Sequence, residues 1–143
     1  MRISTLLAAK GDSVATITPD TTVTGAVDAL REHGVGALVV SSDGEHIDGI
    51  VSERDIVRGL AGQLAALLDE PVRSIMTSQV FTVSPDDDVE PLMALMTERR
   101  IRHVPVVSNG ILAGIVSIGD VVKSRIGELE KDRKELVEYI NAR

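Results

Sequence analysis

The sequence carries the same short polar motif, Ser-x-x-Asp, twice, each time directly after the run Gly-Ile-Val. Its members are Ser52 with Asp55 and Ser117 with Asp120. If each serine lies where a strand leads into a helix, free backbone N–H groups and the positive end of the helix dipole gather beside it, which suits a phosphate. An aspartate three residues later projects from the first helical turn and can accept hydrogen bonds from both hydroxyls of a ribose. The motif therefore predicts a sugar-phosphate ligand.

The same residues also fit a purely structural role. Each serine can be the N-cap of a helix, and each aspartate can be the acid of a capping box. A duplication copies caps as well as ligands, so the recurrence of the motif does not decide between the two roles. Two other side chains are equally open. Arg54 is either a phosphate ligand or a solvated surface residue, and His103 is either a ligand or a partly buried structural histidine.

Other site chemistry finds no support in the residue types. The chain has no cysteine, which excludes disulfides, thiolate metal sites and a cysteine nucleophile. Its three histidines lack metal-ligand spacing, and the acids at 86–88 are expected to be a helix-start cluster rather than a cation site. Phosphate-loop and nucleophile-elbow motifs are absent, and Gly34-Val-Gly36 precedes a predicted strand instead of following one. We therefore predict no catalytic residue, no metal site and no enzyme activity.

Charge and composition narrow the range of partners. The 143-residue chain has a formal net charge of −7, which repels nucleic-acid backbones and anionic lipid. Aromatic residues make up only 1% of the chain, too few to stack on single-stranded bases. No apolar run approaches the ~20 residues of a membrane span, and the N-terminal stretch is too short for a signal peptide. We expect a cytoplasmic protein with no nucleic-acid or membrane partner.

An internal duplication organises the chain. The run Val-x-Thr-x-x-Pro-Asp begins at Val14 and again at Val80, and the correspondence holds through Gly44 and Gly110. One residue is then lost, so that the two Gly-Ile-Val-Ser-x-x-Asp runs stay aligned. A match that preserves Pro-Asp, Gly and Ser-x-x-Asp together indicates two copies of one unit.

Each copy is predicted to have the element order β-α-β-β-α. Hydrophobic residues spaced i, i+3, i+4, i+7 from Val23 indicate a first helix that ends at Gly34, with a counterpart that begins near Val89. A second helix is expected to open at each Ser-x-x-Asp. The predicted strands are 14–18, 37–41 and 47–52 in the first copy and 80–84, 104–108 and 111–117 in the second.

Turns and a connector link these elements. The pairs Asp43-Gly44 and Asn109-Gly110 predict hairpin turns between the second and third strands of each copy. The segment 60–79 is expected to connect the two copies and to be partly helical at 64–68.

From about Asp120, a long polar helix is expected to run toward the C-terminus. Its apolar residues trace one stripe, which Arg133 interrupts. The stripe allows two interpretations, a solvated helix that leans on its own domain or a contact with a second copy or a partner protein. Its members are Val122, Ile126, Leu129, Leu136 and Ile140.

With these features in place, the sequence resembles a tandem pair of CBS domains, repeats named after cystathionine β-synthase. The resemblance rests on the two Gly-Ile-Val-Ser-x-x-Asp runs, on Val-Arg-Ser-Ile-Met-Thr at 72–77 and on Arg-Ile-Arg-His-Val-Pro-Val-Val at 100–107. It covers roughly residues 1–127. It implies an α/β fold of two βαββα repeats packed about a pseudo-twofold axis, followed by a long C-terminal helix. The implied division is a first repeat at 1–70, a second at 71–127 and a helical extension at 128–143.

The resemblance also implies two related clefts, each built from both repeats. Because Gly36 and Ala37 stand where the second repeat has Arg102 and His103, we expect the first cleft to hold a phosphate more tightly. The first cleft would contain Ser52, Arg54 and Asp55 with Val80, Phe81, Arg102 and His103. The second would contain Ser117 and Asp120 with Val14, Ala15, Thr16, Gly36 and Ala37, and Pro105 completes the implied ligand-binding set.

By the same resemblance, the ligand would be AMP, ADP, ATP or S-adenosylmethionine, and no cofactor would be required. We therefore predict a regulatory module that senses an adenine nucleotide and changes its contacts with a partner protein or a second copy, with a homodimer formed through the CBS pairs. The alternative is a ligand-independent scaffold that oligomerises through its sheets and its C-terminal helix.

Overall fold

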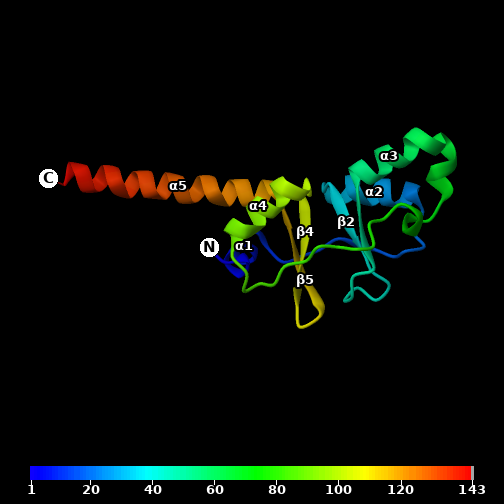
Figure 1. Cartoon of the computed structure of the whole chain (residues 1–143), viewed down its shortest axis with the longest axis horizontal. Helices are drawn as coiled ribbons and strands as arrows, with labels where there is room; N and C mark the ends of the chain where they lie inside the picture. Colours follow the sequence, from blue (N-terminus) through cyan, green and yellow to red (C-terminus); the bar gives the residue numbers. More distant parts are fainter. Residues whose placement is uncertain (143) are drawn as a thin grey trace.

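The computed structural model describes residues 1–142, apart from the side chain of Leu64, and has a mixed α/β fold with one long C-terminal helix (Figure 1). The order of its helices and strands confirms two repeats of similar build. In chain order the elements are α1 (Ile3–Lys10), β1 (Thr16–Ile17), α2 (Val23–His33), β2 (Ala37–Val40), β3 (Gly49–Ser52), α3 (Glu53–Gln63), the 3₁₀ helices η1 (Leu64–Asp69) and η2 (Val72–Ser74), α4 (Val89–Arg99), β4 (His103–Ser108), β5 (Ile111–Ser117) and α5 (Ile118–Asn141).

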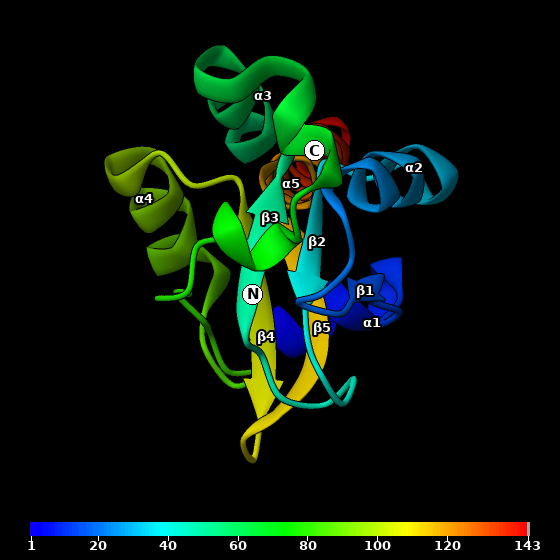
Figure 2. The ribbon, with the colours of Figure 1, turned by 90° about the vertical axis from the view of Figure 1, so that its right-hand side faces the viewer.

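Each repeat contributes one small sheet. In the first repeat, β1 is parallel to β2 and β2 is antiparallel to β3. In the second repeat, β4 and β5 form an antiparallel ladder with an irregularity between Val106 and Val107. Figure 2 shows the strands of both sheets in the middle of the molecule, with α2 and α4 on opposite sides of them.

The strand expected at 80–84 is wrong in extent, because only Val83 pairs with β4. Its N–H donates to the carbonyl oxygen of Pro105 at 3.1 Å. The first repeat has a further bond at the equivalent place, from the N–H of Val39 to the carbonyl oxygen of Ala15 at 3.3 Å. The position that corresponds to Val39 is Pro105, which has no N–H to donate. The strand therefore shrinks to a single bridge.

Left-handed backbone occurs in the turn of the second hairpin and at the residue that ends the first helix of each repeat. Asn109 (φ 52°) and Gly110 (φ 79°) form the predicted two-residue turn between β4 and β5, where positive φ at both residues matches the twist of the strands. Gly34 ends α2 with φ 63°, as expected from its lack of a Cβ. At the equivalent place in the second repeat, Arg100 ends α4 with φ 55°.

The turn expected at Asp43-Gly44 is wrong, because β2 ends at Val40 and β3 begins only at Gly49. The intervening loop folds around one carboxylate. Asp43 accepts hydrogen bonds from the N–H groups of Glu45 and His46 at 2.8 and 2.7 Å. These bonds help to hold the pKa of Asp43 well below its usual range. A further hydrogen bond, between Nδ1 of His46 and Oδ2 of Asp43 at 2.7 Å, lowers the pKa of Asp43 and raises that of His46. A side-chain acceptor has replaced the tight turn.

Each repeat has its own hydrophobic core. Each core also includes residues from the segment that precedes the other repeat. α1 buries Ile3, Leu6 and Leu7 in the core of the second repeat, with Val89 and Met96 among their neighbours. Residues 72–76, which lead into the second repeat, pack on the core of the first repeat through Val72, Ile75 and Met76. The domain boundaries at residues 70 and 127 stay a prediction. Each repeat nevertheless depends for its core on the segment that precedes the other.

The C-terminal helix α5 begins at Ile118 and projects well beyond the rest of the fold (Figure 1). Val121 near its start is buried against the second core. The predicted apolar stripe is exposed along the projecting part, and Ile126 and Leu129, for example, are 51% and 52% exposed. No helix in the described residues combines the length and apolar character that crossing a membrane requires.

Candidate functional site

A cleft of about 930 Å³ opens between the two repeats, at the ends of β2, β3 and β4. It brings together all the residues that were predicted for the first cleft. α3 supplies two of them from its first turn, just after the cap residue Ser52, and the segments that flank α4 supply the others. The set is Ser52, Arg54, Asp55, Val80, Phe81, Arg102 and His103.

Gly36 and Ala37, which were predicted for the second cleft, also line this one. The N-terminal end of β2 faces that of β4. A Cβ built on Gly36 would lie 3.2 Å from Cε1 of His103 and 3.3 Å from Oε1 of Glu53. The absence of a side chain at residue 36 therefore makes room for His103 and keeps the cleft open at this point.

The remaining predicted residues lie outside this cleft. Ser117 and Asp120 form the second strand-to-helix junction, and Pro105 is buried within β4. Val14, Ala15 and Thr16 lie in and just before β1. The structure thus brings the first predicted group together in one cleft, and the second group, apart from Gly36 and Ala37, lies outside that cleft.

Both Ser-x-x-Asp motifs form capping boxes, which confirms the structural role weighed from the sequence. At the first junction, the N–H and hydroxyl of Ser52 donate to Oδ2 of Asp55 at 2.9 and 3.0 Å. The N–H of Asp55 donates back to Oγ of Ser52 at 3.3 Å. The bonds to the carboxylate all use Oδ2, so capping leaves Oδ1 available to accept from a ligand in the cleft.

At the second junction, the chain itself fills the equivalent position. Nζ of Lys10, in the last turn of α1, donates to Oδ2 of Asp120 at 2.6 Å and to the carbonyl oxygen of Ile115 at 2.7 Å. In the first repeat, the equivalent carbonyl of Ile50 accepts instead from the backbone N–H of Thr77 at 2.9 Å. Lys10 therefore substitutes for a backbone donor and at the same time neutralises the acid of the motif.

The electrostatics of Asp120 agree with this arrangement. Partial burial acts to raise the pKa of its carboxyl, but the hydrogen bonds from Lys10 and Ser117 outweigh burial and hold the pKa below its usual value. Asp120 is consequently an ionised partner of Lys10. The two motifs thus differ, because one faces an open cleft and the other is closed by α1.

Several cleft residues were missed by the sequence reasoning, most notably three arginines. Arg99 lies with its guanidinium carbon 5.5 Å from the centroid of the Phe81 ring, a cation–π contact that orients both side chains. Nη1 of Arg54 reaches the carbonyl oxygen of Arg100 at 3.5 Å across the cleft. The run Glu-Arg-Arg-Ile-Arg at 98–102 was a usable signal for a basic wall. The missed residues are Ile50, Glu53, Arg58, Thr77, Gln79, Arg99, Arg100 and Ile101.

His103 is held neutral at pH 7. Burial lowers the pKa of its imidazole and outweighs the opposite pull of the carboxylates of Asp120 and Glu53. An anionic group that entered the cleft beside His103 would favour its protonation. No cluster of three potential metal ligands among His, Cys, Asp and Glu occurs in the part of the chain that the structure describes.

Lowering the pH from about 7.5 to about 5.5 should therefore destabilise the fold through His103. In the unfolded chain this group titrates near pH 6.5, and in the folded chain below that value. As the pH falls through this window the unfolded state takes up the proton first, so the free energy of unfolding drops by at most about 1.4 kcal/mol per pH unit. Urea unfolding at both pH values measures the drop, and His103→Gln should remove it.

His46→Gln is the matched control for this pH experiment. Asp43 raises the pKa of His46, so its stabilising contribution is present below pH 6.5 and is lost as the pH rises through its folded pKa. The two substitutions should therefore change the pH dependence of stability in opposite directions. A slope that His103→Gln leaves intact would contradict a neutral, buried His103.

Comparison with known proteins gives these features a family context. The CBS domain matches this chain twice, at residues 11–62 and 72–127. CBS domain-containing protein CBSX3, mitochondrial, from Arabidopsis thaliana is 39% identical over 146 residues, which span 96% of this chain and 71% of that protein.

Solved structures agree in fold. The CBS-domain containing protein ATU1752 from Agrobacterium tumefaciens superposes with a TM-score of 0.84 at 45% identity, over 87% of this chain and 99% of that one. CBS domain protein PAE2072 from Pyrobaculum aerophilum, solved in complex with AMP, has a TM-score of 0.74 at 33% identity, over 84% of this chain and 89% of that one. With two tandem matches over most of its length, the chain belongs to the CBS domain family.

Proposed function

We propose that this chain is a non-catalytic regulatory module that binds an adenosine ligand in the cleft between its two repeats. The observation that carries the proposal is the placement of Asp55 and its capped helix on one wall of a cleft whose other wall holds Phe81, Arg102 and His103. A relative with the same fold, PAE2072, was solved with AMP. One cleft therefore combines an acceptor for a diol, an apolar face and cations for a phosphate.

Each part of an adenosine ligand has a chemical counterpart in the cleft. Val80 and Phe81 provide an apolar surface for the adenine ring. Oδ1 of Asp55 would accept from the ribose hydroxyls, while Oδ2 stays in the capping box. Arg54 and Arg102 lie on opposite walls, so that a phosphate between them would bridge the two repeats.

A ligand that bridges the two repeats could regulate the protein by changing how the repeats are arranged. A ligand shifts a conformational equilibrium only by the difference between its affinities for the two states. A molecule held by side chains from both repeats would favour the arrangement in which those side chains converge. α5 continues directly from β5 of the second repeat, so a change between the repeats would move the projecting helix and the contacts it makes.

Asp55→Ala should weaken binding of AMP or ATP by about 10- to 100-fold, because it removes the charged acceptor to which the ribose hydroxyls would donate. Isothermal titration calorimetry on the full chain measures this loss. Asp120→Ala is the matched control, since it breaks the same kind of capping box at the junction outside the cleft. Its effect on affinity should stay within about threefold. A wild-type chain that binds no adenosine ligand would refute the proposed function.

The exposed stripe on α5 favours one alternative, a ligand-independent scaffold. Ile126, Leu129 and Leu136 are each more than half exposed on a helix that projects from the fold. A scaffold predicts an oligomer that Asp55→Ala leaves unchanged in light scattering and that truncation after Gly127 abolishes. Adenosine binding that Asp55→Ala abolishes would separate the proposed function from this alternative.

A further inference from the structure

We infer that the cleft selects an adenosine ligand with two or more phosphates, a nucleoside di- or triphosphate, over a monophosphate or a cationic S-adenosyl compound. The inference rests on the proposed function and specifies, in addition, the charge that the ligand should carry. Its basis is an unpaired arginine cluster on both walls of the cleft. The cluster consists of Arg54 and Arg58 of α3, Arg99 at the end of α4, and Arg100 and Arg102 between α4 and β4.

The local charge of the cleft is opposite to that of the whole chain. The five arginines are offset by only two lining acids, Glu53 and Asp55, which leaves 5 − 2 = +3 in a chain of net charge −7. A phosphate monoester carries at most about −2 at pH 7, whereas each added phosphate contributes roughly one more negative charge. Only a di- or triphosphate carries enough charge to neutralise the arginine cluster, and a sulfonium cation would add to it.

The arginine cluster has no carboxylate partners of its own. Among the described residues, none of its five guanidinium groups lies within salt-bridge distance of an acid. Arginines elsewhere do pair, Arg31 with Asp28 and Arg125 with Glu128. The chain itself therefore leaves a net positive charge in the cleft, and an anion with several charges would neutralise it.

Arg100 adds an independent observation from the backbone. It occupies the left-handed region with φ 55°, where a side chain with a Cβ is strained. The equivalent residue of the first repeat is Gly34, which has φ 63° without that strain. Arg100 nevertheless stands at this position and lines the cleft. Backbone strain that a glycine would remove is therefore retained at a residue that lines the proposed ligand site, as is common at such sites.

The test compares ligands of increasing charge on the wild-type chain. Calorimetry without Mg²⁺, at low salt, should give an affinity for ATP at least tenfold higher than for AMP, with ADP between them and S-adenosylmethionine weakest. The logarithm of the ATP affinity should fall more steeply with salt than that of the AMP affinity, because more charge pairs form. Equal or tighter binding of AMP or S-adenosylmethionine would overturn the inference and leave the proposed function standing. No binding of any adenosine ligand would remove both.

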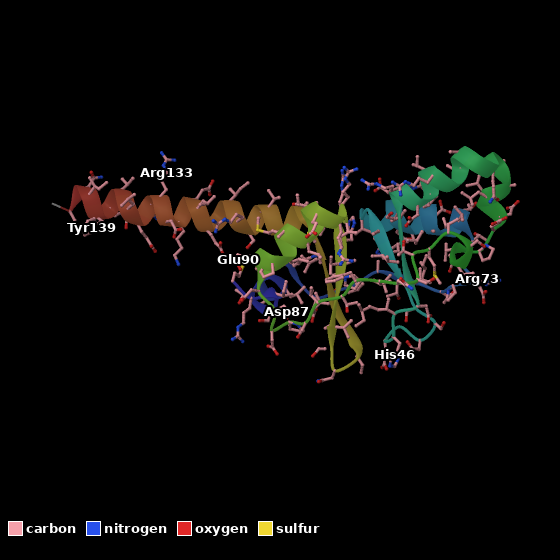
Figure 3. All side chains as sticks on the ribbon, viewed as in Figure 1. His46, Arg73, Asp87, Glu90, Arg133 and Tyr139 are labelled. Atoms are coloured by element: carbon pink, nitrogen blue, oxygen red, sulfur yellow. The ribbon has the colours of Figure 1, made fainter. Side chains whose placement is uncertain are left out.

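Two variants test the arginine cluster directly. Arg100→Gly should raise the melting temperature of the free chain while it weakens ATP binding about tenfold and AMP binding by less than threefold. Arg58→Gln should weaken ATP binding selectively without any change to a strained backbone position. Arg133→Gln is the control, because Arg133 projects from α5 far from the cleft (Figure 3). ATP affinity that both cleft variants leave at the wild-type value would overturn the inference.

Discussion

Removal of residues 1–10 should unfold the second repeat, although this segment precedes the first. Ile3, Leu6 and Leu7 are 0%, 4% and 8% exposed and lie in the core of the second repeat. At about 1.5–3 kcal/mol for each fully buried side chain, their loss amounts to roughly 5–9 kcal/mol. That figure is comparable with the whole stability of a typical domain, about 5–15 kcal/mol. Far-UV circular dichroism and urea unfolding of the truncated chain would measure the effect.

A single substitution in α1 tests the same packing with a smaller expected loss of stability. Ile3→Ala should reduce the free energy of unfolding by about 2–5 kcal/mol, because it leaves a cavity in a closed core. Ser4→Ala, one residue away on the exposed face of α1, should change it by no more than about 0.5 kcal/mol. A truncated chain with the wild-type melting temperature would show that α1 is dispensable.

Gly49→Ala should destabilise the first repeat and weaken ligand binding at once. A Cβ at residue 49 would lie 2.6 Å from Sδ of Met76 and 2.9 Å from the carbonyl oxygen of Thr77. Thr77 exchanges backbone hydrogen bonds with Ile50 at 2.9 and 3.0 Å, and both residues line the cleft. The side chain of Met76 can move, but the carbonyl oxygen of Thr77 is backbone, so full relief requires a shift of that bridge. We expect a loss of about 1–3 kcal/mol in the free energy of unfolding and a several-fold loss of affinity.

The equivalent residue of the second repeat provides the control. The three atoms nearest a Cβ on Gly114 all belong to the side chain of Leu7, with Cδ2 at 2.8 Å, and a side chain can adjust more easily than backbone. Gly114→Ala should therefore cost less stability than Gly49→Ala and should leave the affinity of the cleft unchanged. Urea unfolding and calorimetry on both variants make the comparison. Equal effects on affinity would contradict a role for the Ile50–Thr77 bridge in shaping the cleft.

Local signals predicted most of the fold correctly because they act over a few residues. The helix stop at Gly34 and the turn at Asn109-Gly110 each depend on backbone conformations that their own residue types favour. One failure came from a partner distant in sequence, and the other from a local side-chain acceptor. The strand at Val83 is short because Pro105, at the position that corresponds to Val39, has no N–H to donate, and the loop at Asp43 closes on a carboxylate that competes with the tight turn.

The candidate site was predictable only in part for the same reason. Ser52 and Asp55 predict a helix start, and the duplication led us to expect a second, weaker site at Asp120. Tertiary packing of α1 brought Lys10 onto that acid, a contact between residues 110 positions apart that no local pattern indicates. Arg58 was missed because a single arginine on an amphipathic helix has the appearance of an ordinary solvated residue.

The exchange of leading segments bears on how such a chain could have arisen. A single ancestral copy that carried only its own leading segment would have had nothing to complete its core. It would have folded only with a twin, each inserting its first residues into the other. Duplication and fusion would then have turned an obligatory intertwined dimer into one polypeptide. Later substitutions, such as a lysine at residue 10, could then change one repeat without changing the other.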